Sequence, residues 1–522
     1  MDQAAAIRRS AALYRANNAV ICDGRSLTYA ELFDRACRLA DGLRELGAEP
    51  TDSIAVLSPN SLELPEQAVA CALGNHPRAT LYTYHAPDVN RYLLELVGAR
   101  VLLVHSDYYA DLAPLLGDLA ELKAVVVFGP DRPVGVIGYE DLLSSSSPKD
   151  PGVTAHPDDP FMIRFSSGTT GRPKAIYHSV DRWRRLTNEW RWVTPAMDER
   201  SRYLSAVSLA HLGVALLWDV LSVGGAVVPM PAFDGGEALD IIEKQKVTHA
   251  TAAPVMVRAM LDAAGSRTRD LSSLQCLLYA GSPITVETMR RAIELFGSTA
   301  LHQMYGQSEA LPSTMLLPHQ HVLSGTAIEL QRLRSVGRPT PNVQVTIRAE
   351  NGGILPTGQT GEIAVHSTFT MSGLWRDPEG TAERLTDDGG VLTRDMGYLD
   401  EDGFVYLVDR KDDMIVSGGY NIWPTEIEAA LNDHPDVLEA CVFGVPDERW
   451  GETPKAIVVL EPGSEASADE LIAHTRETLG GVKKITSVDF VKALPRTSTG
   501  KVQRGLLKEP YWQGRDIRIA GM

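Results

Sequence analysis

Along the first two thirds of the chain, segments in which apolar residues recur at helical spacing alternate with short apolar runs. From Thr28 to Gly47 apolar residues recur at helical spacing, and Thr28 and Glu31 are spaced as a capping box. Short, almost continuously apolar runs follow such segments, as expected of parallel strands covered by helices on both faces. The pattern predicts an α/β fold, with strands beginning near Ser53, Arg100, Leu122, Phe161, Lys246 and Leu274.

The pattern changes twice in the last third of the chain. Residues 335–409 form short apolar stretches separated by turn residues, and Asp402-Gly403 is typical of a hairpin turn, so we predict an antiparallel β subdomain. Beyond Arg410 helical and strand-like segments alternate, which predicts a small α+β domain. The expected organisation is a large domain over residues 1–409 and a small, mobile C-terminal domain over residues 410–522.

Composition and charge reduce the number of function classes that the chain can belong to. The chain has 522 residues and a net charge of −17, which argues against nucleic acid or an anionic membrane as a partner. Its five cysteines are scattered without a CxxC pair, which disfavours a disulfide framework or a zinc site. The N-terminus lacks the apolar core of an export signal and no run is long enough to span a membrane, so we expect a cytoplasmic protein. The oligomeric state stays open.

One loop has the composition of a phosphate-binding site. A predicted buried strand from Phe161 runs into small and hydroxyl-bearing residues and ends at a lysine. Such residues allow the backbone amides to surround an anion, and the lysine adds a positive charge. The spacing is not that of a Walker A loop. The candidate residues are Ser166, Ser167, Gly168, Thr169, Thr170, Gly171 and Lys174.

This loop is the first of several motifs that occur in a fixed order. The others begin at Gln303 (QMYGQSE), Thr393 (TRD), Asp409 (DRKDD), Ser417 (SGGYNI) and Pro495 (PRTSTGK). Together they resemble the adenylate-forming superfamily, which contains acyl-CoA synthetases, luciferases and adenylation domains. The resemblance covers nearly the whole chain. It implies an ATP-dependent, AMP-forming acid ligase with ATP and Mg²⁺ as cofactors and CoA as the probable co-substrate.

The resemblance also assigns nucleotide-binding roles. Glu309 would be a magnesium ligand, Asp395 would accept hydrogen bonds from the ribose hydroxyls, and Arg410 would hold the ribose. Arg394 stands where the family usually has a small residue, which makes the local packing unusual. Further residues expected around ATP are Gly281, Ser282, Pro283, Tyr305, Gly306, Gln307 and Ser308.

The C-terminal motifs imply two working conformations. Lys501 would bridge the carboxylate and the α-phosphate while charge builds between them. A rotation of the small domain about Asp412 would then bring the acceptor loop to the acyl adenylate. That loop contains Ser417, Gly418, Gly419 and Tyr420.

The acid pocket is less clearly defined, and residues 210–219 are expected to form a helix that enters the core. His211 stands where the resemblance places the aspartate that pairs with the ammonium of α-amino-acid substrates, so we expect an acid without an α-amino group, with a cyclic or aromatic body. A core histidine is the alternative. The segment Asn75–Asn90, with Tyr82 and Tyr84, departs from the family pattern. Expected pocket residues are His211, Ala215, Val255, Tyr279, Ala280, Gly281 and Met304.

Three classes of function remain open. The first is transfer of the acyl group to CoA, because SGGYNIWP closely resembles the CoA-ligase loop. The second is amide formation with an amine or amino acid, for which His211 or Asp219 would act as the base; an ion pair within the large domain is the alternative role of Asp219. The third is a non-enzymatic relative, which the intact set of charged residues disfavours. A carrier-protein thiol is a further possible acceptor.

Overall fold

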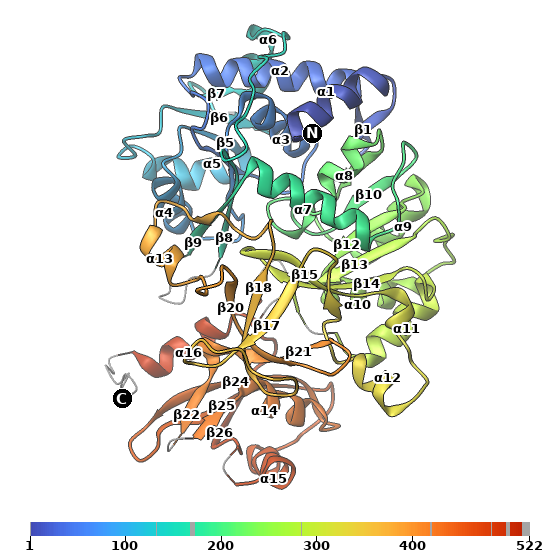
Figure 1. Cartoon of the computed structure of the whole chain (residues 1–522), viewed down its shortest axis with the longest axis vertical. Coiled ribbons are helices and arrows are strands. Elements are labelled where there is room, and N and C mark those ends of the chain that lie inside the picture. Colours follow the sequence, from blue (N-terminus) through green and yellow to red (C-terminus); the bar gives the residue numbers. More distant parts are fainter. Residues whose placement is uncertain are drawn as a thin grey trace. The chain divides into compact units, whose positions relative to one another are not determined.

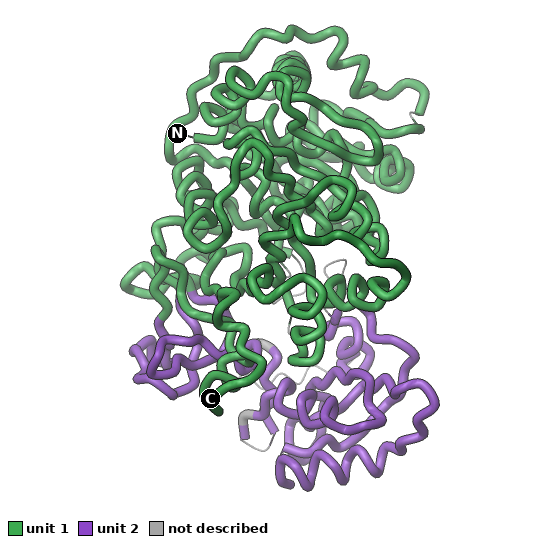
Figure 2. Tube along the Cα trace, turned by 90° about the vertical axis from the view of Figure 1, so that its right-hand side faces the viewer, with its two compact units in different colours: residues 1–345, 365–391 green, residues 346–364, 392–522 purple. Residues whose placement is uncertain are grey.

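The computed structural model describes residues 2–131, 133–166, 173–282, 284–417, 420–481, 483–496 and 502–513, without the side chains of Asp412 and Asn421. The chain divides into two compact units (Figure 2). Unit 1 comprises residues 1–345 and 365–391, and unit 2 comprises residues 346–364 and 392–522. Each unit has its own hydrophobic core.

Unit 1 contains two large sheets (Figure 1). The first has nine strands in the order β16-β15-β14-β13-β12-β10-β11-β1-β2. Its centre is parallel, while β2, β15 and β16 run antiparallel to their neighbours. The bounds are β1 Asn18–Cys22, β2 Arg25–Thr28, β10 Arg202–Ser205, β11 Ala226–Pro229, β12 His249–Ala252, β13 Cys276–Ala280, β14 Leu301–Gln307, β15 Ala310–Leu316 and β16 Arg338–Pro339.

The second sheet of unit 1 has eight strands in the order β19-β9-β8-β4-β3-β5-β6-β7. Strands β8 to β7 are parallel, and β9 folds back antiparallel on β8. The bounds are β3 Ile54–Leu57, β4 Arg78–Thr80, β5 Val101–His105, β6 Ala124–Phe128, β7 Ile137–Gly138, β8 Pro160–Ser166, β9 Lys174–Ser179 and β19 Gly373–Leu374.

Helices connect and cover these strands. Thr28 caps α2 in the predicted capping box with Glu31. The helices are α1 Gln3–Leu13, α2 Tyr29–Glu45, α3 Glu63–Gly74, α4 Pro87–Val97, α5 Ser106–Leu112, α6 Tyr139–Ser145, α7 Val180–Val193, α8 Leu217–Ser222, α9 Gly235–Gln245, α10 Pro254–Ala264, α11 Val286–Phe296, α12 Ala327–Arg332 and α13 Pro378–Ala382, with 3₁₀ turns η1 Ala113–Leu115, η2 Leu212–Val214 and η3 Pro318–Gln320.

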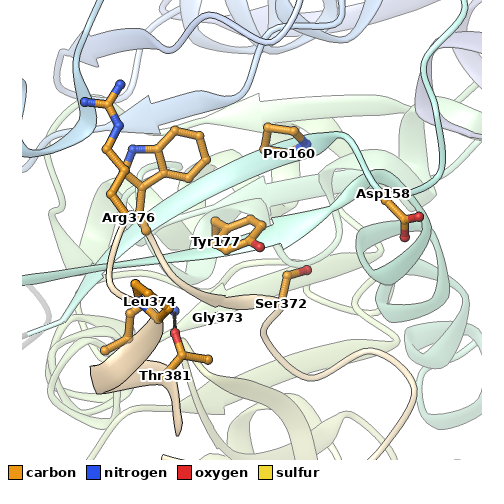
Figure 3. Close-up of a pocket in the computed structure, with 10 residues that line it drawn as sticks. Asp158, Pro160, Tyr177, Ser372, Gly373, Leu374, Arg376 and Thr381 are labelled. Carbon is orange, nitrogen blue, oxygen red and sulfur yellow. Dashed lines mark hydrogen bonds between the residues drawn. The ribbon is translucent and has the colours of Figure 1, made fainter.

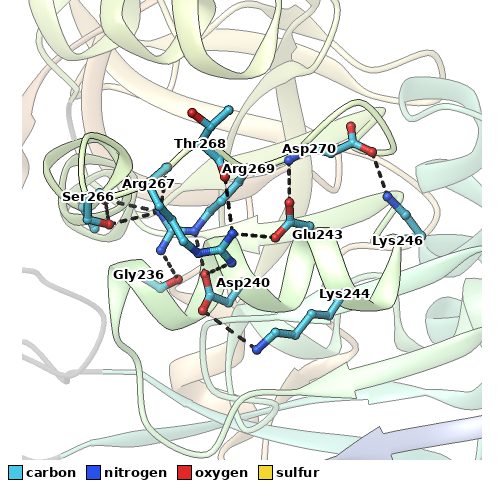
Figure 4. A network of polar contacts seen from close by, with 11 residues as sticks. Gly236, Asp240, Glu243, Lys244, Lys246, Ser266, Arg267, Thr268, Arg269 and Asp270 are labelled. Atoms are coloured by element: carbon cyan, nitrogen blue, oxygen red, sulfur yellow. Dashed lines mark hydrogen bonds and ion pairs between the residues drawn. The ribbon is translucent and has the colours of Figure 1, made fainter.

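Ion pairs fasten the connection between α10 and β13 to α9 (Figure 4). Arg269 Nε lies 2.6 Å from Asp240 Oδ1, and Arg267 Nη1 lies 2.8 Å from Glu243 Oε2. Exposed pairs contribute little singly, so this network matters by fixing the course of the loop that leads into β13.

Unit 2 contains most of a four-stranded antiparallel sheet and the C-terminal fold. The four strands are β17 Gln344–Arg348, β18 Gly361–His366, β20 Val391–Leu399 and β21 Val405–Arg410. The second sheet consists of β22 Ile415–Ser417, β23 Tyr420–Ile422, β24 Val437–Asp447, β25 Gly451–Leu460 and β26 Ser487–Phe490. Its two faces carry separate apolar clusters, one with α14 (Pro424–Asn432) and α15 (Ala468–Leu479), the other with α16 (Arg504–Trp512). The 3₁₀ turn η4 (Lys411–Asp413) precedes β22.

The predicted fold class is confirmed: parallel-rich sheets covered by helices, an antiparallel β sheet, and a small α+β fold at the C-terminus. The predicted hairpin at Asp402-Gly403 joins β20 to β21. The domain boundary at Arg410 stays a prediction; the compact units group the antiparallel strands largely with the C-terminal segment. Among the described residues, helices with the length and apolar character to cross a bilayer are absent.

Candidate active site

The residues predicted to line the acid pocket gather at one edge of the nine-stranded sheet. Strand β13 ends at Ala280, which pairs with Met304 of β14. The neighbouring strands β10 and β12 lead directly into the segments that carry His211 and Val255. In open α/β sheets ligands bind outside the carboxyl ends of the strands, so this edge is a chemically reasonable place for the acid.

The segment around His211 is more sharply folded than the sequence suggested. A continuous helix over residues 210–219 was expected, but the 3₁₀ turn Leu212–Val214 precedes a separate helix α8. The cause is Gly213: a Cβ there would lie 2.3 Å from Ser205 Oγ and 2.7 Å from Ser208 O. Only glycine fits this close approach, and the fold-back places half-buried His211 ahead of the turn.

Tyr279 is fully buried, and its hydroxyl has partners inside the protein. It lies 2.8 Å from His321 Nε2 and 3.3 Å from Gln303 Oε1. Burial raises the pKa of the Tyr279 phenol and lowers that of the His321 imidazole to about 4, so both groups are neutral near pH 7. Tyr279 can therefore present to an acid only its ring, and His321 is a partner that the sequence did not indicate.

Asp219 forms the ion pair that was the alternative to a role as base. Its side chain on α8 is 4% exposed, and Oδ1 lies 2.9 Å from Arg191 Nε on α7. Burial raises the pKa of Asp219 to about 7, against the opposing effect of Arg191. The carboxylate is thus held between two helices, and a role as base remains a proposal.

The predicted phosphate loop connects two antiparallel strands. Ser166 ends β8, Lys174 begins β9, and the two residues are paired in the ladder. The residues between them that were expected to bind phosphate, Ser167, Gly168, Thr169, Thr170 and Gly171, lie outside the described part of the chain, as does Pro283.

The unusual segment Asn75–Asn90 contains an aromatic cluster, which lies beside the end of β8. Tyr82 stacks on Tyr84 with ring centroids 5.2 Å apart, and His85 packs edge-on against both. The Tyr82 hydroxyl donates to Phe165 O at 2.9 Å, and its ring lies 6.1 Å from that of His211. The cluster therefore lies between the end of β8 and His211, an arrangement that the sequence alone did not show.

Glu309 occupies the tight turn between β14 and β15. Gly306 permits this turn, since a Cβ there would lie 2.8 Å from Ala310 O. The Glu309 side chain is only 2% exposed, and Oε1 lies 3.5 Å from Arg384 Nη2. Tyr305 and Ser308, expected near ATP, are buried in the same turn region. Arg384 was not predicted, because 75 residues separate it from Glu309.

The residues present fit a magnesium ion that is bound together with a nucleotide. Among the described residues no three His, Cys, Asp or Glu side chains form a metal-binding group. Mg²⁺ is usually held by one or two carboxylates plus phosphate oxygens and water. One buried carboxylate, Glu309, matches that need.

Two predicted nucleotide-binding residues of unit 2 are in contact. Asp395 on β20 pairs with Arg410 on β21 in the antiparallel ladder, and Arg410 Nη1 lies 2.6 Å from Asp395 Oδ1. A carboxylate can accept hydrogen bonds from hydroxyl groups, and a guanidinium can donate hydrogen bonds to oxygen atoms. The pair is therefore suited to hold a ribose between a positive and a negative group.

Arg394 explains why a small residue is usual before the aspartate. Its φ is 60°, in the left-handed region where a Cβ costs roughly 1–2 kcal/mol. The conformation is held by its backbone N–H, which donates to Glu362 Oε1 at 3.0 Å, and by Thr393 Oγ1, which donates to Ile363 O at 2.8 Å. The Asp395 position is thus maintained despite the unfavourable residue.

The hinge and the acceptor loop are described in part. Asp412 lies in the turn η4 without a described side chain, and Ser417 and Tyr420 end β22 and begin β23. Gly418, Gly419 and Lys501 lie outside the described residues. Arg504, three residues after Lys501, forms ion pairs with Asp413 and with Glu428, the latter at 2.7 Å.

One hollow in the described residues has no part in the predicted acid pocket. It is an open pocket of about 480 Å³ beside β9, lined by Tyr177, Gly373 and Leu374 among others (Figure 3). A smaller neighbour of about 300 Å³ shares Leu374 and includes Lys174. Neither pocket includes the residues predicted to bind the acid.

Comparison with known proteins places this fold and motif set among adenylate-forming enzymes. The AMP-binding enzyme family matches residues 7–375, and the AMP-binding enzyme C-terminal domain matches residues 426–501. The chain therefore belongs to the AMP-binding enzyme family, which confirms the predicted superfamily and enzyme class.

Its relatives differ in the acceptor named for them. Feruloyl-CoA synthase of Amycolatopsis sp is 35% identical over 94% of both chains. Indoleacetate–CoA ligase of Aromatoleum aromaticum is 33% identical over 95% of this chain and 96% of its own. The amide bond synthetase McbA of Marinactinospora thermotolerans has a similar structure, with a TM-score of 0.84 at 30% identity over 97% of this chain and 99% of its own.

Proposed function

We propose that the protein activates a carboxylic acid without an α-amino group, with a cyclic or aromatic body, as an acyl adenylate and then transfers the acyl group to CoA. The observation that carries this proposal is the lining of the sheet edge. The side chains of Ala215, Ala280 and Met304 are apolar and buried, and His211 replaces the acid that an ammonium group would need. Relatives named for ferulate and indoleacetate support an aromatic acid.

Adenylation joins two anions, so positive charge has to be placed between them. A carboxylate oxygen attacks the α-phosphorus of ATP and pyrophosphate leaves, giving acyl-AMP. In this proposal Lys174 would contact phosphate, the Asp395–Arg410 pair would hold the ribose, and Lys501 would bridge the two reacting groups. Glu309 would hold Mg²⁺, which neutralises phosphate charge when it is bound.

Thioester formation then needs a different environment around the same carbonyl. The CoA thiol attacks the acyl carbon as its proton is lost, and AMP leaves. In our proposal the C-terminal fold rotates about Asp412 between the two steps, so that the loop with Ser417 and Tyr420 replaces Lys501 at the acyl group. The match to the CoA-ligase loop favours CoA as the acceptor.

Amide formation is the second candidate, and the similarity to an amide bond synthetase favours it. An amine is largely protonated at neutral pH and needs a base, whereas a thiol is reactive even when only partly ionised. His211 and Asp219 are the candidate bases. The ion pair of Asp219 with Arg191 makes it the weaker of the two.

The test is a panel of aromatic, alicyclic and aliphatic acids incubated with ATP and Mg²⁺, with products detected by mass. Each acid is supplied with CoA, with an amine, or with neither. We expect thioesters of aromatic acids with CoA, and acyl-AMP without an acceptor. Amides formed in place of thioesters would transfer the assignment to the second candidate.

Enlarging one pocket residue tests the location of the acid. We expect Ala215→Phe to shift the accepted acids toward smaller bodies by about tenfold or more in relative kcat/KM, since it only adds volume. The KM for ATP should not change. The acid profile and the ATP KM are measured side by side; an unchanged profile would place the acid elsewhere.

Removing the charge of Asp219 tests the base. We expect Asp219→Asn to keep acid-dependent pyrophosphate exchange and most of the thioester rate. If the enzyme makes amides with Asp219 as base, the same variant should lose amide formation, and the wild-type amide rate should rise with pH through about 7, as the carboxyl group ionises. A folded variant that makes amide at the wild-type rate would exclude Asp219 as the base.

A further inference from the structure

A buried guanidinium on β8, two residues before Ser166, has no counter-ion among the described residues. Arg164 on β8 is 3% exposed, and its Nε and Nη1 atoms have no hydrogen-bond partner among the described residues. No carboxylate in the described part of the chain forms an ion pair with it. An isolated buried charge is strongly unfavourable, so such a group is usually paired or used.

The strand register shows which way Arg164 faces. It shares a face of β8 with Ser166, because alternate residues of a strand point to the same side. The ladder pairs Ser166 with Lys174 and Arg164 with Ile176, one step further from the loop. Arg164 therefore lies on the same side of the sheet as the two residues that flank the phosphate loop.

Two further buried polar side chains share this face. The register that pairs Arg78 with Met162 and Ala79 with Ile163 sets Thr80 beside Arg164. Thr80 Oγ1 and both ring nitrogens of His178 are buried, and none of them has a hydrogen-bond partner in the described part of the chain. His178 pairs with Met162 in the strand register. Burial and the charge of Arg164 lower the pKa of His178 to about 3, so His178 is neutral and adds no positive charge.

The charges near Arg164 are compatible with one bound anion. The pKa of Arg164 is lowered by burial, and the opposing influence comes from Tyr82 and Glu309. Glu309 already has a guanidinium partner, Arg384, at 3.5 Å. The carboxylate that influences Arg164 therefore has an ion-pair partner of its own, and the described residues offer Arg164 none.

We propose that Arg164, with the Thr80 hydroxyl beside it, forms an oxyanion subsite on the face shared by β8 and β4. In the working enzyme the subsite is filled by the carboxylate of the acid or by a phosphate oxygen of ATP, and this identification rests on the function proposed above. A guanidinium offers two parallel N–H donors to either group. The unpaired charge would lower the stability of the free enzyme and strengthen the binding of its ligand.

Arg78 provides a matched control on the same sheet face. It is also a buried arginine, but it donates to Leu64 O at 3.2 Å and to Leu209 O at 3.4 Å. Its removal breaks both buried hydrogen bonds, so we expect Arg78→Met to lower the melting temperature. Arg164→Met removes only a charge without a partner, and we expect it to raise the melting temperature of the ligand-free protein by a few degrees.

The experiment compares wild type, Arg164→Met, Arg164→Lys and Arg78→Met. Melting temperatures are measured alone, with ATP, and with an accepted acid, and the KM of each ligand is obtained from pyrophosphate exchange. We expect Arg164→Met to weaken one of the two ligands by about tenfold to a hundredfold, as for a lost hydrogen bond to a charged group. The ligand whose KM rises, ATP or the acid, supplies the oxyanion. Arg164→Lys should show a smaller rise of the same KM than Arg164→Met.

Some results would overturn the subsite. Unchanged KM values for both ligands in Arg164→Met would show that no oxyanion binds there. An equal loss for both ligands in Arg164→Met and Arg78→Met would indicate general damage. If Arg164→Met does not fold, Arg164→Gln supports the same comparison. A wild type without exchange for any acid would instead contradict the proposed function, and the ATP-induced melting shift would still test the subsite.

Discussion

Replacing Lys501 with alanine should lower the rate of acyl-adenylate formation by about a hundredfold or more, because it removes a positive charge from the transition state. Thioester formation from supplied acyl-AMP should remain nearly intact, since in our proposal Lys501 is withdrawn from the acyl group in that step. Pyrophosphate exchange measures the first half-reaction, and acyl transfer from synthetic acyl-AMP measures the second.

The comparison of the two half-reactions makes this test specific. Lys508 provides a control lysine in the same region, since it lies over the Trp512 ring at 5.2 Å and has no assigned role in either step. Lys508→Ala should leave both rates close to wild type. Equal losses in the two half-reactions of Lys501→Ala, with an unchanged melting temperature, would contradict the two-conformation account.

Replacing Glu309 with glutamine should also reduce adenylation by about a hundredfold or more, and it should raise the Mg²⁺ concentration needed for half-maximal rate. The change keeps the shape of the side chain and removes the charge that would bind the metal. It also leaves Arg384 beside a neutral group. Exchange rates are measured over a range of Mg²⁺ concentrations.

Glu189 is a matched control for this substitution. It is buried in the same unit and accepts hydrogen bonds from the backbone and the side chain of Asn342, at 3.0 and 2.7 Å. Glu189→Gln should lower stability without changing the Mg²⁺ dependence. A Glu309→Gln enzyme with the wild-type Mg²⁺ profile would remove Glu309 from the metal site.

Local patterns predicted much of the fold. The capping box of α2, the apolar strands β3, β5, β6, β8, β12 and β13, and the hairpin at Asp402-Gly403 all depend on residues close together in the chain. The expectation of a continuous helix over residues 210–219 was wrong. Gly213 lies close to the Ser205 side chain and to the backbone around it, and this close approach cannot be read from local spacing.

The site was predictable as a set of motifs, but not as a set of contacts. Motif spacing indicated Glu309, Asp395 and Arg410, whereas Arg384 and Arg191 come from distant segments that carry no motif. The isolation of Arg164 was even less accessible, because it depends on the absence of a partner across three strands. Such features follow from tertiary packing and not from periodicity.

The most direct test of the central claim follows the oxygen atoms of the acid. An accepted acid labelled with ¹⁸O in its carboxylate is incubated with ATP, Mg²⁺ and CoA, and the nucleotide products are analysed by mass. Attack of the carboxylate on the α-phosphorus predicts one ¹⁸O atom in AMP and none in pyrophosphate. Unlabelled AMP, or ADP together with labelled inorganic phosphate, would contradict the assignment as an acyl-adenylate-forming ligase.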